Sequence, residues 1–176
     1  MKNIITFSIP EELHDSAFFK KGTTVSFDPS DYEEWNAEGL HQFKYEILLF
    51  NGKASYLPWD HASHVLPEVL GEWDRINREL AKLYEERNAK LAAPLMEKAI
   101  HICFSYLYWL NHKPVELKEW TKQTETFEFV PVNFSERMAF SLSRPGLYQS
   151  YKVIEQMMAE LQKLAAKAEI RRRRKI

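Results

Sequence analysis

Two histidines and a glutamate near the middle of the chain have the spacing of a metal site. His61, His64 and Glu68 follow one another at intervals of three and four residues, so they share one face if a helix begins early enough. Two imidazoles and one carboxylate can hold zinc or iron. This pattern predicts a metal-dependent enzyme. In the competing interpretation, Asp60 or Ser63 caps the helix and both histidines lie exposed in its first turn.

A second group of polar residues lies near two expected helix ends. Asn133, Glu136, Arg137 and Arg144 occur there among several aromatic residues. An arginine beside aromatic rings and a carboxylate can bind an acidic or planar ligand. Such an arginine more often ties helix ends together. The group is therefore a candidate surface for a partner or ligand, with a structural role as the alternative.

The end of the chain is a run of positive charge made of Arg171, Arg172, Arg173, Arg174 and Lys175. These are five of the 24 basic residues, which leaves 19 basic against 25 acidic residues in the rest of the chain, a net charge of −6. An acidic body argues against a broad nucleic-acid-binding face, because phosphate binding needs clustered Lys and Arg. The run itself is a candidate site for DNA, RNA or anionic lipid. Repulsion between its like charges predicts a frayed arm.

Two reactive side chains in the most apolar part of the sequence are expected to be structural. Cys103 has apolar neighbours, where a thiol is usually a small hydrophobe with a raised pKa and not a nucleophile. His101 has no acid placed nearby in sequence to orient it as a base, so we expect it to satisfy a buried hydrogen bond. A single cysteine excludes an intramolecular disulfide and fits a reducing cytoplasm.

The elements that position these residues are expected to be helices. A hydrophobic content of 45%, with 14% aromatic residues, predicts an ordered chain with a packed core. Residues 21–27 form the only strand-like piece. Apolar spacing and caps predict helices over about residues 8–20, 28–51, a long segment carrying Leu66 to Leu83, residues 95–111, part of 114–127, a segment from Asn133 or Ser135, and one from Leu147.

The most apolar stretch, Ala99 to Asn111, marks the expected centre of the fold. Pro94 can begin a helix there, and residues 95–111 are apolar nearly all round. The stretch is shorter than the roughly 20 residues that a membrane span requires, so no span is predicted. The fold class is a single-domain all-α bundle of about six or seven helices around this buried helix. It comprises residues 1–170 and is followed by a basic tail, residues 171–176.

The last expected helix carries an apolar seam from Leu147 to Ala168, at alternating steps of four and three residues. Such a seam packs against another helix. Packing inside the chain is the expected use of the seam, and pairing with a second copy is the alternative. The oligomeric state, monomer or homodimer, therefore stays open.

Two motifs carry a resemblance to a known family. They are Trp109-Leu-Asn-His-Lys-Pro-Val-Glu-Leu-Lys-Glu-Trp120 and Val130-Pro-Val-Asn-Phe-Ser-Glu-Arg, which continues to Arg144-Pro-Gly-Leu-Tyr148. They resemble the uncharacterised bacterial YpoC-like family over roughly residues 95–165. The family pattern is Asn-Gly-Lys-Pro-Val, Pro-Val-Asn with Glu-Arg, and Arg-Pro before a Tyr-bearing helix, so this chain departs from it at His112. The resemblance implies a helical cytoplasmic protein and carries over no catalytic residues.

These observations predict a non-enzymatic interaction or adaptor protein of the cytoplasm. The expected contact with an unknown protein partner is the basic tail or the surface around Arg137 and Arg144. One alternative is an enzyme with a metal at His61, His64 and Glu68. Another is a nucleic-acid-associated protein that binds through its tail. No cofactor is predicted.

Overall fold

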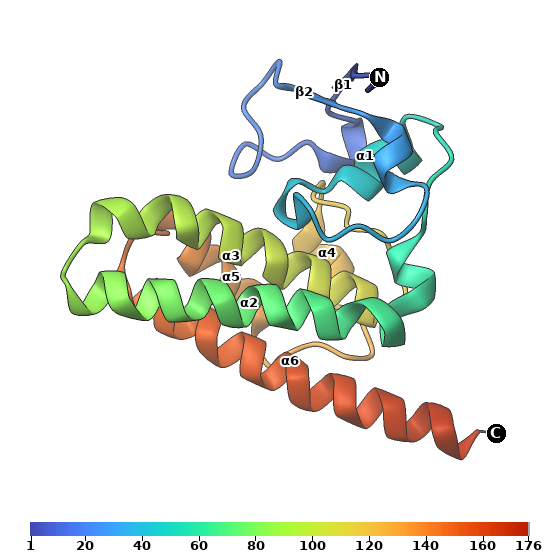
Figure 1. Cartoon of the computed structure of the whole chain (residues 1–176). Coiled ribbons are helices and arrows are strands. Elements are labelled where there is room, and N and C mark those ends of the chain that lie inside the picture. Colours follow the sequence, from blue (N-terminus) through green and yellow to red (C-terminus); the bar gives the residue numbers. More distant parts are fainter. Residues whose placement is uncertain (176) are drawn as a thin grey trace.

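Helix α3 (Ala89–Leu110) is the most deeply buried element of the molecule. From Ala99 to Leu110 every residue is buried except His101, which is partly buried. A helix that is apolar on almost all sides must be covered on all sides. The computed structural model, which describes residues 1–175, confirms the prediction of a mostly helical fold around this helix (Figure 1).

Four further helices pack around α3 in the C-terminal two thirds of the chain. Helix α2 (Ala62–Glu85) lies beside α3 as the other arm of a helical hairpin, and α6 (Tyr148–Arg174) crosses the pair (Figure 1). Helix α5 (Phe134–Ser143) packs on α6, and α4 (Trp120–Thr124) contacts α5. The C-terminal end of α6 projects beyond the other helices (Figure 1).

The N-terminal part of the chain forms a smaller layer at one end of α3 (Figure 1). Strands β1 (Ile5–Ser8) and β2 (Thr24–Phe27) pair antiparallel, with Ile5 opposite Phe27. Helix α1 (Lys44–Phe50) follows them. Short 3₁₀ turns complete the layer at Glu11–Leu13, Pro29–Tyr32, Leu40–Gln42 and Pro58–His61. The two strands make the fold mostly helical and not strictly all-α.

The predictions of two helices in the N-terminal layer are wrong. The segment 8–20 contains one 3₁₀ turn, because the backbone on both sides of that turn is extended. The segment 28–51 is α-helical only from Lys44, because Gly39 and Phe43 have positive φ angles of 68° and 54°. A left-handed residue cannot continue a right-handed helix.

The bounds of two long helices also differ from the prediction. Helix α3 begins before Pro94, because the side chain of Asn88 accepts a hydrogen bond from the backbone N–H of Leu91 (3.2 Å) and caps the helix there. Helix α6 continues through Arg174 instead of fraying at Arg171. Opposite-charge pairs three and four residues apart, from Glu169 to the following arginines, offset the repulsion in this last turn.

One buried carboxyl group links the N-terminal layer to α3. Glu46 of α1 is fully buried, and its Oε1 accepts hydrogen bonds from Nε1 of Trp109 (2.7 Å) and the backbone N–H of Val115 (3.1 Å). Its Oε2 has no hydrogen-bond partner among residues 1–175. Burial disfavours the charged form and raises the pKa of Glu46 to about 7.

Replacement of Glu46 by Gln should remove a pH dependence from the free energy of unfolding. Because the pKa of Glu46 is raised from 4.5 to about 7 on folding, the wild type loses stability as the pH rises through this window. Gln keeps an acceptor for Trp109 without the charge. We expect the variant to gain about 3 kcal/mol relative to the wild type between pH 4.5 and pH 8, measured by urea unfolding.

The control is Glu46→Ala, which loses both hydrogen bonds and leaves a cavity, so it should be less stable than the wild type at pH 4.5. A difference between wild type and Glu46→Gln that stays constant across the pH window would contradict this account of the buried carboxyl group.

Candidate interaction groove

The structure does not bring His61, His64 and Glu68 to a common point. His61 precedes α2, and its ring stacks on Tyr56 with 4.8 Å between centroids. Glu68 accepts a hydrogen bond from Nε1 of Trp35 (2.6 Å). In the part of the chain that the structure describes, no three His, Cys, Asp or Glu side chains gather as a metal site requires. Both histidines are exposed at the start of α2, where no side chain caps the helix.

Cys103 and His101 have the structural roles that their sequence context predicts. Burial raises the pKa of the Cys103 thiol to about 12, so the thiolate form of a nucleophile is disfavoured. Burial also lowers the pKa of His101 to about 4, so its ring is neutral near pH 7. Nδ1 of His101 then donates a hydrogen bond to the backbone oxygen of His41 (2.8 Å). Cys103 packs in the core, and His101 links α3 to the backbone of the Leu40–Gln42 turn.

Of the second candidate group, Arg137 makes a structural contact and the other three residues lie at the surface. Arg137 forms a two-pronged ion pair with Glu160 of α6, with N–O distances of 2.9 and 2.8 Å, and its side chain is 20% exposed. Asn133, Glu136 and Arg144 are exposed at or near the ends of α5. Arg137 therefore ties α5 to α6, which is the alternative that the sequence left open.

A hollow of about 630 Å³ lies between α2, α3 and the C-terminal end of α6, and we call it the α2–α6 groove. Its floor is apolar and comes from segments far apart in the sequence. The main apolar side chains are Leu66, Leu70, Tyr106, Leu110, Phe129 and Ala168. Leu66, Tyr106 and Leu110 belong to the core, so the groove opens directly onto it.

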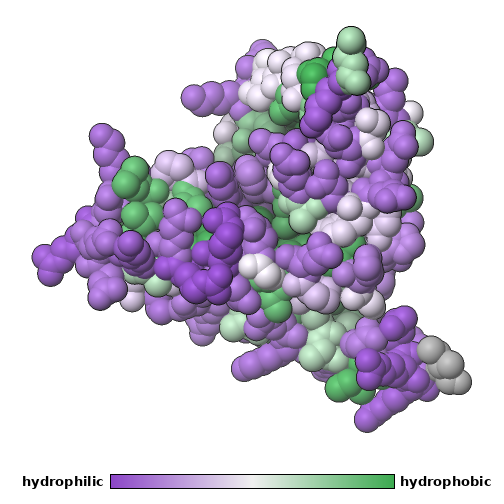
Figure 2. Space-filling view, in the orientation of Figure 1, coloured by the Kyte–Doolittle hydropathy of each residue, from purple (hydrophilic) through white to green (hydrophobic). Residues whose placement is uncertain are grey.

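The rim of the groove is basic and comes from the last turn of α6. Arg171, Arg172, Arg173 and Lys175 line it, and in the space-filling view hydrophilic side chains gather at this end of α6 beside a hydrophobic one (Figure 2). Arg171 donates a hydrogen bond to Glu128 (2.6 Å). The structure therefore places most of the predicted basic run beside an apolar hollow, which the sequence did not indicate.

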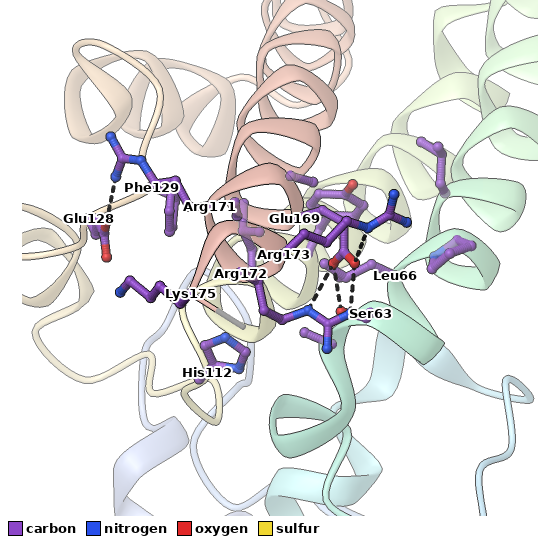
Figure 3. A pocket seen from close by; sticks show the side chains of 17 residues that line it. Ser63, Leu66, His112, Glu128, Phe129, Glu169, Arg171, Arg172, Arg173 and Lys175 are labelled. Atoms are coloured by element: carbon purple, nitrogen blue, oxygen red, sulfur yellow. Dashed lines mark hydrogen bonds and ion pairs between the residues drawn. The ribbon is translucent and has the colours of Figure 1, made fainter.

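Glu169 carries the other ion pairs of the rim (Figure 3). Its carboxylate accepts hydrogen bonds from Nη2 of Arg172 (2.7 Å) and from Oγ of Ser63 (3.0 Å), and Nε of Arg173 lies 3.5 Å away. These hydrogen bonds lower the pKa of Glu169, so its carboxylate is ionised near neutral pH. The contact with Ser63 joins α6 to the start of α2.

His112, the position at which the chain departs from the resemblance, also lines the groove. It follows Asn111, the C-cap residue of α3. Its φ is positive (57°), a conformation that favours glycine. Its Nδ1 donates a hydrogen bond to the backbone oxygen of Trp59 (3.0 Å). A glycine would adopt this backbone conformation with less strain, and the histidine adds a contact that glycine lacks.

The pair between Arg137 and Glu160 should contribute to stability. In a double-mutant cycle of Arg137→Ala and Glu160→Ala, we expect a coupling energy of about 1 kcal/mol, because the pair is bidentate but partly exposed. Urea unfolding of the four proteins measures it. A coupling energy near zero would return Arg137 to the candidates for a partner surface.

Comparisons with known proteins identify a family and a relative of the chain. Residues 63–173 match the model of a family described as YpoC-like protein. An uncharacterised relative, YpoC of Bacillus subtilis (strain 168), is 26% identical over 108 residues, which cover 61% of this chain and 66% of the relative. No solved structure matches the chain significantly. The family match includes α2, α3 and α6 almost completely. The chain belongs to the YpoC-like family.

Proposed function

We propose that this protein is a non-enzymatic interaction module that binds an acidic, partly apolar segment of a partner protein in the α2–α6 groove. The observation that carries the proposal is an apolar floor and a basic rim in one hollow. An uncovered apolar hollow rimmed by polar residues is typical of a binding site. Arginine is enriched at protein interfaces, where its planar group recognises carboxylates.

The floor of the groove favours a protein segment over nucleic acid, which is the second candidate partner. A phosphate backbone would use the run Arg171 to Lys175, because that run supplies clustered positive charge. It would leave Leu70 and Phe129 uncovered, since phosphates and sugars offer little apolar surface to cover them. An acidic segment that also carries apolar side chains would use both parts of the groove.

Three side chains of types that catalysis often uses have structural contacts, which supports a binding role over catalysis. Cys103 lies in the core, His101 is hydrogen-bonded to the backbone of His41, and Glu68 is hydrogen-bonded to a tryptophan. A cytoplasmic location belongs to the same proposal and is supported by the single free cysteine. In residues 1–175 every helix is too short or too polar to cross a lipid bilayer.

A synthetic helical peptide with leucine on one face and glutamate on the other tests the proposal. The wild type should bind it, and Arg172→Gln with Arg173→Gln should weaken binding about tenfold, because two cations of the rim are lost. Arg78→Gln, which removes an exposed arginine of α2 outside the groove, should change binding less than about twofold. Fluorescence anisotropy at two salt concentrations measures all three proteins.

A version of the peptide with lysine in place of glutamate should not bind. Equal weakening by the rim variant and by Arg78→Gln would contradict the groove as the site. If a DNA duplex binds more tightly than the peptide, and deletion of residues 171–176 abolishes that binding, the protein partner is replaced by nucleic acid. Sedimentation of the free protein shows whether a second copy of the chain covers the groove instead.

A further inference from the structure

The rim arginines are already bonded to carboxylates of the protein itself. Arg172 and Arg173 contact Glu169 on one side of α6, and Arg171 contacts Glu128 on the other side (Figure 3). Both glutamates line the groove. Each of these three arginines therefore contacts an acid in the place where an acidic partner would have to bind.

The carboxylate of Glu169 is held from two directions. Arg172 donates from Nη2 to Oε1 (2.7 Å) and from Nε to Oε2 (3.3 Å), and both nitrogens belong to the same helix as Glu169. Ser63 of α2 donates to Oε2 (3.0 Å) from the opposite wall of the groove. The carboxylate thus lies between α2 and α6, two of the helices that line the groove.

Resting on the proposed function, we infer that Glu169 occupies the position that a partner's carboxylate takes on binding. The partner's acid displaces Glu169 from Ser63 and Arg172, and the Glu169 side chain turns towards solvent. The exchange replaces one carboxylate by another, so the number of hydrogen bonds on the arginine and the serine is unchanged. An exposed ion pair contributes little to stability, so the exchange is accessible.

This inference defines the chemistry of the partner more closely. Because one carboxylate replaces another, the charged contacts select the partner while the apolar floor supplies most of the affinity. The partner segment must place an acidic side chain beside apolar side chains that reach Leu66 and Leu70. Such a pairing on one face is what an acidic amphipathic helix presents, in the manner of other helix-in-groove complexes.

Replacement of Glu169 by Gln separates this inference from general electrostatics. The variant loses the internal competitor but keeps the arginines, so we expect it to bind the leucine and glutamate peptide about fivefold more tightly than the wild type. Glu97→Gln removes the same charge from an exposed site of α3 outside the groove and should change binding less than about twofold. Glu128→Gln should tighten binding as well, because it releases Arg171.

The possible outcomes distinguish the inference from the proposed function. Tighter binding by Glu169→Gln, with Glu97→Gln unchanged, supports the inference. Equal tightening by both variants shows a non-specific charge effect, and weaker binding by Glu169→Gln shows that Glu169 organises the site; either result overturns the inference and leaves the proposed function standing. If neither the wild type nor any variant binds the peptide, the proposed function fails and the inference fails with it.

Discussion

Helix α3 must be buried, and the other elements of the fold are arranged to bury it. Its C-terminal half is apolar on every side, so elements must cover it all round. Helices α2 and α6 cover two sides, and the 3₁₀ turns Leu40–Gln42 and Pro58–His61 cover another. Even the polar groups of this half are drawn into the core, because the indole N–H of Trp109 finds its partner in the buried carboxyl group of Glu46.

The groove forms because α6 is longer than the part of the core that it covers. From Tyr151 to Leu161 the apolar seam of α6 is buried inside the chain, as expected for intramolecular packing. Beyond Leu161 the helix continues, but Ala165 and Ala168 are too small to fill the space over α2 and α3. The last turn then brings arginines to the edge of a hollow that the core leaves open.

The long helices could be predicted from the sequence because their apolar spacing is strong and local. In the N-terminal layer only the strand-like character of residues 21–27, which contain β2, could be predicted. The rest of its backbone is fixed by contacts that follow no helical spacing. The hydroxyl of Tyr45, for example, accepts a hydrogen bond from the backbone N–H of Asn36 (2.6 Å) and donates to the backbone oxygen of Glu34 (3.2 Å). Such contacts hold a loop where propensity alone favours a helix.

Only the positive charge of the candidate site could be predicted from the sequence. The basic run is visible in sequence, and the residues that surround it are not, because Ser63, Tyr106 and Phe129 come from three separate segments. No spacing rule relates them before the fold is known. The acids that pair with the arginines are equally hidden, since Glu128 lies in a loop far from Arg171 in the sequence.

Backbone amide hydrogen exchange can show whether α3 is the buried centre of the fold, because it measures how far each segment must unfold before its amides meet solvent. If α3 is the buried centre, the amides from Ile102 to Leu110 exchange most slowly, at the rate set by global unfolding. The amides after Ala168 in α6 then exchange much faster. Exchange in α3 as fast as in the projecting end of α6 would contradict a fold built around a buried central helix.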